Sequence, residues 1–314
     1  MSRIHEALKK AEQERAAVQT TDLGPGPRDG IETDAVPAFS TRSAENLTEM
    51  DSPRVSVSSA PAEYLRFDEL QKQSAHSEWR LDPNVNVFFN PGLSPRGAEQ
   101  FRTLRSRLYQ IRANQSLRTL LVTSSVPGEG KTFITANLAQ AIVRQPDRRV
   151  LIIDADLRCP RLHVPLGAPN SPGLTDYLRG EADEAAVIQY GQEDNLCFIA
   201  GGNLAKNPSE LLSNGMLKKL LDRVSPVFDW VLLDSPPCLP VADPTMLADH
   251  CDGVLLVVRA GKTASEVAQK ACQELQGKNI IGVVVNAVED SHLYGTYYYQ
   301  GYGYGADESK EVRA

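Results

Sequence analysis

The chain has 314 residues, of which 41% are apolar and 23% charged, so it is long enough for one sizeable α/β domain with extensions. Its net charge of -7 argues against a non-specific nucleic-acid binder, which needs a basic surface to neutralise phosphates. The 5 cysteines are widely spaced without a C-x-x-C pair, which favours neither a zinc site nor a redox dithiol. We therefore expect reduced thiols in a cytoplasmic protein that binds no nucleic acid.

The N-terminal part shows one short periodic segment and then a long irregular one. Ile4, Leu8 and Ala11 recur at helical spacing among charged residues, which predicts a short amphipathic helix within residues 1–18. Residues 19–80 are rich in Ser, Thr, Pro, Ala, Asp and Glu without a sustained period, which predicts a disordered linker. No apolar run approaches the roughly 20 residues that span a bilayer, so we expect membrane association only through a partner.

Residues 81–290 are expected to form the folded domain. Apolar residues at helical spacing predict a helix from about Ser94, and a second helix is predicted over Thr132–Val143. The β-rich runs are residues 117–124, 149–154, 196–200, 230–234, 253–258 and 280–285. Near-continuous apolar strands that alternate with helices are typical of a mostly parallel sheet covered on both faces, so we predict a doubly wound α/β fold.

A phosphate-binding loop is predicted between the first strand and the helix that follows it. Its sequence is Ser125-Val126-Pro127-Gly128-Glu129-Gly130-Lys131-Thr132, which fits the P-loop pattern except that a serine replaces the first glycine. The glycines let successive N–H groups point at a β-phosphate, and the lysine is expected to bridge the β- and γ-phosphates. The threonine hydroxyl is a ligand that Mg²⁺ prefers. We therefore expect ATP and Mg²⁺ as cofactors, with Thr135 also on the nucleotide side.

Acidic residues follow two of the predicted strands. Asp154 and Asp156 follow one apolar run, and Asp234 ends another. Ligands of open α/β sheets bind at the carboxyl ends of the strands, where these acids are expected to meet the phosphate loop. A single acid at a strand end often only forms a turn or a helix cap. Three such acids beside a P-loop favour a catalytic, metal-binding site.

These motifs resemble those of the bacterial tyrosine kinases of exopolysaccharide and capsule assembly (CpsD/CapB-like), over about residues 90–290. The segments that carry the resemblance are the phosphate loop and residues 154–163, 228–237, 207–212, 257–260 and 282–286, together with the opening residues 1–10. Partition and cell-division ATPases (ParA/MinD-type) share this fold. They carry a signature lysine where this chain has Val126, and they lack a tyrosine-rich tail, so both points favour a kinase.

The resemblance also implies roles for the site residues. It implies that Asp154 accepts the proton of the attacking tyrosine, that Asp156 and Asp234 serve Mg²⁺ directly or through water, and that Lys131 neutralises developing charge. Spacing alone does not say which of the first two is the base. Asn286 resembles the family's adenine-side residue, although asparagine at a strand end also forms turns. Arg158 and Arg161 contact phosphate or a neighbouring subunit, or are surface charges, and the sequence leaves these alternatives open.

The C-terminal residues 291–314 are predicted to form a flexible tail. The expected phosphoacceptors all lie in this tail and are Tyr294, Tyr297, Tyr298, Tyr299, Tyr302 and Tyr304. Without a kinase core the same residues would be only a low-complexity aromatic segment. Next to a kinase core, the tyrosine hydroxyls can serve as nucleophiles that accept phosphate. We therefore predict that the protein phosphorylates its own tyrosines.

The resemblance further implies partners. Glu99, Arg102 and Arg105 match the family's E-x-x-R-x-x-R assembly motif, which predicts a homo-oligomer; a solvated ion-pair face is the alternative. We expect a membrane polysaccharide co-polymerase (Wzz-like) as activator, a cognate tyrosine phosphatase, and recruitment to the inner face of the plasma membrane through a partner. Two other functions stay open: a partition-type ATPase switch, and a nucleotide-dependent scaffold with little catalysis.

Overall fold

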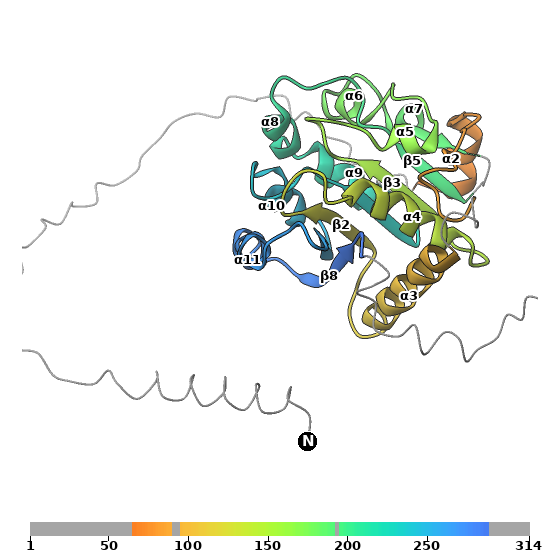
Figure 1. Cartoon of the computed structure of the whole chain (residues 1–314). Helices are drawn as coiled ribbons and strands as arrows, with labels where there is room; N and C mark the ends of the chain where they lie inside the picture. Colours follow the sequence, from red (N-terminus) through yellow and green to blue (C-terminus); the bar gives the residue numbers. More distant parts are fainter. Residues whose placement is uncertain (1–64, 90–94, 192–194, 289–314) are drawn as a thin grey trace, which may run out of the picture. The chain divides into compact units, whose positions relative to one another are not determined.

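The computed structural model describes residues 65–89, 95–191 and 195–288, which Figure 1 draws in colour. The predicted N-terminal helix, most of the predicted linker and the tyrosine-rich tail lie outside these residues. Within the described ranges, no helix combines the length and the apolar character that crossing a membrane requires.

The described residues form an 8-stranded sheet in the order β1-β4-β5-β3-β6-β2-β7-β8. The strands are β1 (Ala75–His76), β2 (Thr119–Ser124), β3 (Val150–Asp154), β4 (Ile188–Tyr190), β5 (Leu196–Ile199), β6 (Trp230–Asp234), β7 (Gly253–Arg259) and β8 (Ile280–Asn286). All neighbours from β5 to β8 pair in parallel, and these are the strands that the apolar runs predicted. Only β4 pairs antiparallel, with β5. The prediction of a mostly parallel sheet is therefore confirmed.

Helices cover both faces of this sheet, as Figure 1 shows. They are α2 (Phe67–Gln73), α3 (Pro95–Arg112), α4 (Lys131–Val143), α5 (His163–Leu166), α6 (Leu174–Leu178), α7 (Glu184–Val187), α8 (Pro208–Ser213), α9 (Met216–Val224), α10 (Asp243–Ala248) and α11 (Ser265–Glu274). Helices α3, α4 and α5 share one apolar core with the sheet, and the others pack on the opposite face. Strand side chains alternate between the two cores, so Leu120 and Val122 join α4 whereas Leu121 joins the far side.

The folded part of the chain begins earlier than the sequence suggested. Helix α2 and strand β1 lie within the predicted linker, and Phe67, Leu70 and Trp79 are buried. The Trp79 ring stands edge-on to Phe198 of β5, with the ring centroids 6.0 Å apart. The prediction of disorder up to residue 80 is therefore wrong for residues 65–80. A few buried side chains hold this segment on the domain, and its helix is too short for a helical hydrophobic period to show in the sequence.

The topology brings three functional loops to one edge of the sheet. Strand β6 lies between β2 and β3, and all three run in the same direction. Asp154 at the end of β3 is directly opposite Asp234 at the end of β6. The phosphate loop follows β2, so it leaves the sheet at this same edge.

Candidate active site

The phosphate loop adopts the backbone conformation that its glycines allow. Gly128 and Gly130 have φ angles of 84° and 95°, in the left-handed region that other residues avoid. Helix α4 begins directly after them, at Lys131, with Gly130 as its N-cap. The first N–H groups of a helix have no partner within it, so this loop and helix end form a binding site for an anion such as phosphate.

We predict that Gly130→Ala abolishes ATP binding, whereas Gly128→Ala weakens it. A Cβ at position 130 would lie 2.1 Å from Asn286 Nδ2, but a Cβ at position 128 meets no atom within 4 Å. Both substitutions strain the left-handed backbone by about 1–2 kcal/mol, so the difference between them isolates the steric clash. Titration with a fluorescent ATP analogue measures it. Equal dissociation constants for the two variants would contradict the prediction.

Two side chains at and just after the end of β7, together with Glu129 of the loop itself, hold the phosphate loop in its conformation. The carboxylate of Glu129 is buried; it accepts the Val126 N–H at 2.8 Å and the Thr263 hydroxyl. Arg259 Nη1 donates to the Gly128 carbonyl at 3.3 Å. Sequence reasoning missed Thr263, which follows β7 without any motif, although Arg259 lies in the family-like segment 257–260.

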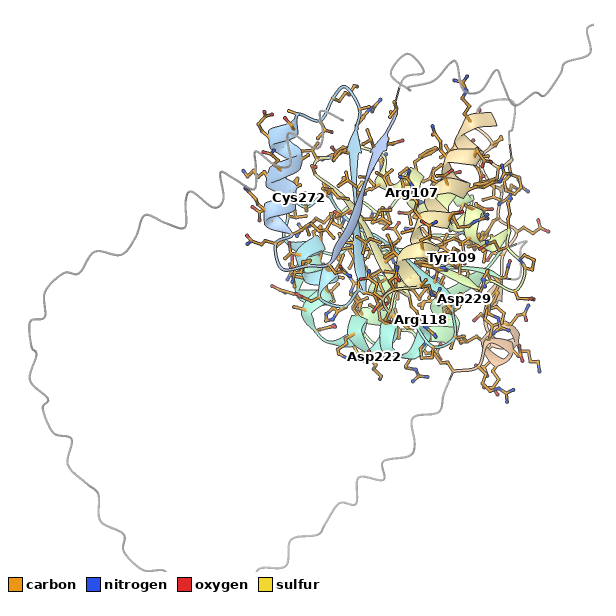
Figure 2. The ribbon with its side chains drawn as sticks, turned by 90° about the horizontal axis from the view of Figure 1, so that it is seen from below. Arg107, Tyr109, Arg118, Asp222, Asp229 and Cys272 are labelled. Atoms are coloured by element: carbon orange, nitrogen blue, oxygen red, sulfur yellow. The ribbon has the colours of Figure 1, made fainter. Side chains whose placement is uncertain are left out.

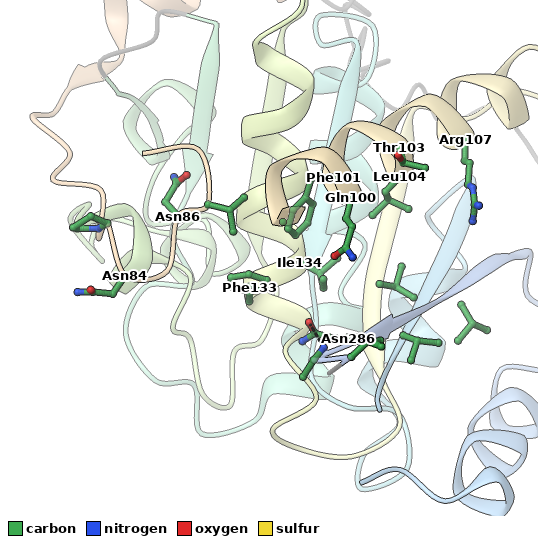
Figure 3. Close-up of a pocket in the computed structure, with 18 residues that line it drawn as sticks. Asn84, Asn86, Gln100, Phe101, Thr103, Leu104, Arg107, Phe133, Ile134 and Asn286 are labelled. Carbon is green, nitrogen blue, oxygen red and sulfur yellow. Dashed lines mark hydrogen bonds between the residues drawn. The ribbon is translucent and has the colours of Figure 1, made fainter. Parts of the chain in front are cut away.

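Asn286 supports this loop as well. Its Nδ2 donates to the Glu129 carbonyl at 2.8 Å, and its Oδ1 accepts the N–H of Ala287. It also lines a pocket of about 830 Å³ between α3 and β8, shown in Figure 3, where Phe101 and Ile134 form part of the apolar wall. No residue of the loop Ser125–Thr132 lines this pocket. A contact of Asn286 with adenine therefore stays a prediction, while its bracing of the loop is a finding.

Ser125 replaces the first glycine of the pattern without distorting the loop. Its side chain is completely buried, and among the described residues its Oγ has no hydrogen-bond partner. Its complete burial is consistent with a small residue at this position.

Lysine, hydroxyl and carboxylate groups converge beside the loop. Lys131 Nζ forms an ion pair with Asp156 Oδ2 at 2.9 Å, and both side chains are largely buried. The Thr132 hydroxyl donates to Asp234 Oδ2 at 2.6 Å. Thr135 is fully buried one turn further along α4 and lies 3.5 Å from Asp234 Oδ1, so it contacts the acid. The structure thus brings together the lysine and the acids that the sequence singled out.

Asp154 is held by the loop that follows it. Its Oδ2 accepts the Leu162 N–H at 2.8 Å, and its Oδ1 accepts the Asp156 N–H at 3.2 Å. Burial, with added repulsion from Asp234, raises the pKa of Asp154 to about 8. Burial likewise raises the pKa of Asp234 to about 6, although Lys131 opposes it. For Lys131, burial acts to lower the pKa but is outweighed by Asp234 and Asp156, so its pKa is raised.

These groups suit a magnesium ion. The donors nearest the loop are a hydroxyl and carboxylates, the hard oxygen ligands that Mg²⁺ prefers. Across the described residues, no cluster of three or more His, Cys, Asp and Glu side chains could hold a metal by itself. In nucleotide sites Mg²⁺ usually has only one or two protein ligands, and waters and phosphate oxygens complete its coordination. The predicted ligands Thr132, Asp156 and Asp234 lie together at this site, and their binding of Mg²⁺ stays a prediction.

The predicted assembly motif divides into two parts. Glu99 and Arg102 on α3 are exposed and form an ion pair at 3.0 Å. Arg105 instead turns inward, and its Nη1 donates to the Ala141 carbonyl near the end of α4 at 2.5 Å. Two of the three residues are thus available to a partner, while the third ties α3 to α4.

The two arginines after Asp156 also differ. Arg158 forms a two-pronged ion pair with the buried Asp243, at 2.7 and 2.9 Å, while 39% of its own side chain is exposed; a contact with phosphate or a neighbouring subunit stays a prediction. Arg161 is exposed, and its Nε donates to Cys159 Sγ at 3.3 Å.

Comparison with known proteins agrees with this site. Residues 120–299 match the CobQ/CobB/MinD/ParA nucleotide binding domain family. The chain is 34% identical to the tyrosine-protein kinase YwqD of Bacillus subtilis, over 66% of this chain and 87% of that protein. It is 36% identical to the putative tyrosine-protein kinase EpsB of Ralstonia nicotianae, over 69% of this chain but only 30% of that longer protein.

A solved structure gives the same result. The kinase domain of the Escherichia coli tyrosine kinase ETK is 33% identical and superposes with a TM-score of 0.57, over 63% of this chain and 80% of that domain. The chain therefore belongs to the CobQ/CobB/MinD/ParA nucleotide-binding family, and within it to the bacterial tyrosine-protein kinases.

Proposed function

We propose that this kinase is an autokinase that transfers the γ-phosphate of ATP to the tyrosine cluster Tyr294–Tyr304 of its own C-terminal segment. The observation that carries the proposal is the convergence of Lys131, Asp154, Asp156 and Asp234 at the mouth of a P-loop. A P-loop ATPase needs the lysine and one acid for the nucleotide and its metal. The two further buried acids give this site a group that can take up a proton.

The chemistry follows from the residues at this edge of the sheet. A tyrosine hydroxyl has a pKa near 10 and is neutral at pH 7, so it must lose a proton as it attacks. The tyrosine oxygen forms a bond to the γ-phosphorus while the bond from that phosphorus to the β–γ bridging oxygen breaks, leaving ADP, and the ionised form of Asp154 accepts the proton. Lys131 neutralises negative charge that develops on the transferred group. Mg²⁺, when bound, supplies further positive charge at the phosphates.

We assign the base to Asp154 because its neighbours leave it free for that task. Each of its oxygens accepts one backbone N–H, which fixes the carboxylate and leaves a lone pair on each oxygen for a proton. Asp156 is instead paired with Lys131, and Asp234 with the Thr132 hydroxyl, the expected metal ligand. Those contacts favour a role toward the phosphates and Mg²⁺ for these two acids.

We also propose that the kinase works in an oligomer and is activated by the cytoplasmic segment of a membrane polysaccharide co-polymerase, which recruits it to the inner face of the plasma membrane. The family resemblance supports the activator, and the exposed Glu99–Arg102 pair on α3 supports a contact between copies. A cognate phosphatase would return the tail to its unmodified state.

One incubation tests the proposal against a partition-type ATPase. We expect the purified full chain to accumulate phosphotyrosine when Mg²⁺ and ATP are added, and to do so faster with the activator segment present. Mass spectrometry should place the phosphates within the tyrosine cluster. ATP hydrolysis without phosphotyrosine, stimulated by DNA or lipid vesicles, would instead identify a partition-type switch, and ATP binding with neither activity would identify a scaffold.

A further inference from the structure

Two arginine–aspartate ion pairs lie at the opposite ends of β3 and β6. At the amino ends, Arg148 precedes β3 and reaches Asp229, which precedes β6, at 3.1 Å. Figure 2 marks Asp229 together with Tyr109, whose ring packs edge-on against Trp230, the first residue of β6. At the carboxyl ends, the corresponding pair is Arg158 with Asp243. One pair therefore lies away from the catalytic edge and the other lies on it.

The pair on the catalytic edge is the more buried and the better bonded of the two. The Asp243 side chain is fully buried, whereas 25% of the Asp229 side chain is exposed. Arg158 holds both carboxylate oxygens of Asp243, and its Nη2 also donates to the Ser209 hydroxyl at 3.0 Å. That hydroxyl in turn donates to Asp243 Oδ1 at 2.7 Å. A buried carboxylate with a two-pronged guanidinium partner resists displacement, because breaking the pair leaves a charge without compensation.

The backbone around Arg158 carries the hydrogen bonds that fix the catalytic acids. The next residue, Cys159, donates its N–H to Asp156 Oδ1 at 3.0 Å. Leu162, at the end of the same loop, donates its N–H to Asp154 Oδ2 at 2.8 Å. Any movement of Arg158 along its loop therefore shifts the donors that orient both acids.

Three acids lie together at this edge of the sheet, so each depends on its partners for its orientation. Asp154 and Asp234 face each other across β3 and β6, and Asp156 lies close enough for its charge to act on both. Lys131 forms its ion pair with Asp156. The orientation of Asp154 and Asp156 therefore depends on the backbone donors of the loop after β3, and on whatever holds that loop in place.

We propose that Arg158 is a positioning residue: by bridging to Asp243 at the start of α10 and to Ser209 on α8, it holds the loop after β3 in place, so that Asp154 and Asp156 keep their catalytic orientation. The inference rests on the roles proposed for these two acids. It concerns the orientation of the acids, and it assigns Arg158 no contact with substrate.

The test compares matched substitutions in the full chain. Arg158→Gln is expected to lower kcat for autophosphorylation about 30-fold while the KM for ATP changes less than about threefold, because the phosphate loop itself is untouched. Arg158→Lys keeps the positive charge but cannot bind both carboxylate oxygens of Asp243 at once, so its kcat should lie between those of Arg158→Gln and the unchanged protein. Arg148→Gln breaks the ion pair at the opposite ends of the same strands and should leave kcat unchanged.

Hydrogen exchange separates positioning from a general loss of stability. In Arg158→Gln, the Cys159 and Leu162 amides should exchange about tenfold faster or more, while amides within β3 keep their protection. Ser209→Ala removes a single hydrogen bond and provides a milder variant if Arg158→Gln does not fold.

Two results would overturn the inference: unchanged exchange at Cys159 and Leu162, or an equal loss of kcat in Arg148→Gln. Faster exchange in Arg158→Gln together with full activity of Asp156→Asn has a different meaning. It would support the positioning role of Arg158 and would contradict the role proposed for Asp156.

Discussion

Replacing Lys131 with methionine is expected to lower autophosphorylation about 100- to 1,000-fold while leaving the protein folded, because the lysine charge serves the phosphates and no part of the core. Only 15% of the Lys131 side chain is exposed, and its ion pair is with Asp156, a residue of the same site. Methionine fills a similar space without the charge. The measurement is the initial rate of phosphotyrosine formation, with a melting curve on the same sample.

The matched control is Lys218→Met, which removes a lysine from the exposed pair with Asp222 on α9. Such a surface pair contributes at most about 1 kcal/mol, so both rate and stability should stay near those of the unchanged protein. A folded Lys131→Met protein that still forms phosphotyrosine at the normal rate would refute the mechanism.

Replacing all six tyrosines of the cluster with phenylalanine is expected to reduce total phosphotyrosine about tenfold or more. The chain has 10 tyrosines, and three of the remaining four lie within the fold. Tyr177 and Tyr190 are buried, and the Tyr109 hydroxyl is buried without a hydrogen-bond partner among the described residues. None of these hydroxyls is accessible to a second active site. Quantitative mass spectrometry after incubation with Mg²⁺ and ATP gives the residual level.

The same variant tests the consequence of modification. Each phosphate adds about -1.5 to -2 charges, so filling the cluster places roughly ten negative charges on one short segment of an acidic protein. We expect the oligomer of the unchanged chain to loosen in Mg²⁺ and ATP and that of the phenylalanine variant to stay intact, as measured by light scattering. Tyr64→Phe serves as the control. Near-normal phosphotyrosine in the six-residue variant, or equal assembly in both chains, would contradict the corresponding part of the proposal.

The central strands and the catalytic loop were predictable because each depends on local sequence. Apolar runs such as residues 230–234 are buried on both faces, and a P-loop needs its glycines and lysine in fixed order. Strands β1 and β4 are 2 and 3 residues long, too short for any periodicity to show. Strand β4 forms because neighbouring segments bury its side chains, and β1 pairs with β4, so both depend on the tertiary structure.

The sequence predicted which residues form the site, but it did not predict most of the residues that hold them in place. The acids at the ends of β3 and β6 were expected to meet, and the register places Asp154 opposite Asp234. The partners that hold the site could not be found in this way. Asp243 and Thr263 are separated from their partners by 85 and 134 residues, and nothing in the local sequence around them marks a contact at that distance.

The burial of Phe67, Leu70 and Trp79 determines how short this kinase can be made. A chain that started at residue 81 would lose these three side chains and uncover the apolar surface beneath them. Burying a large apolar side chain contributes about 1.5–3 kcal/mol, so the three together account for roughly 5–9 kcal/mol. Whole domains are stable by only about 5–15 kcal/mol. We therefore expect the smallest unit that folds independently to start before Phe67, so that it includes residues 65–80.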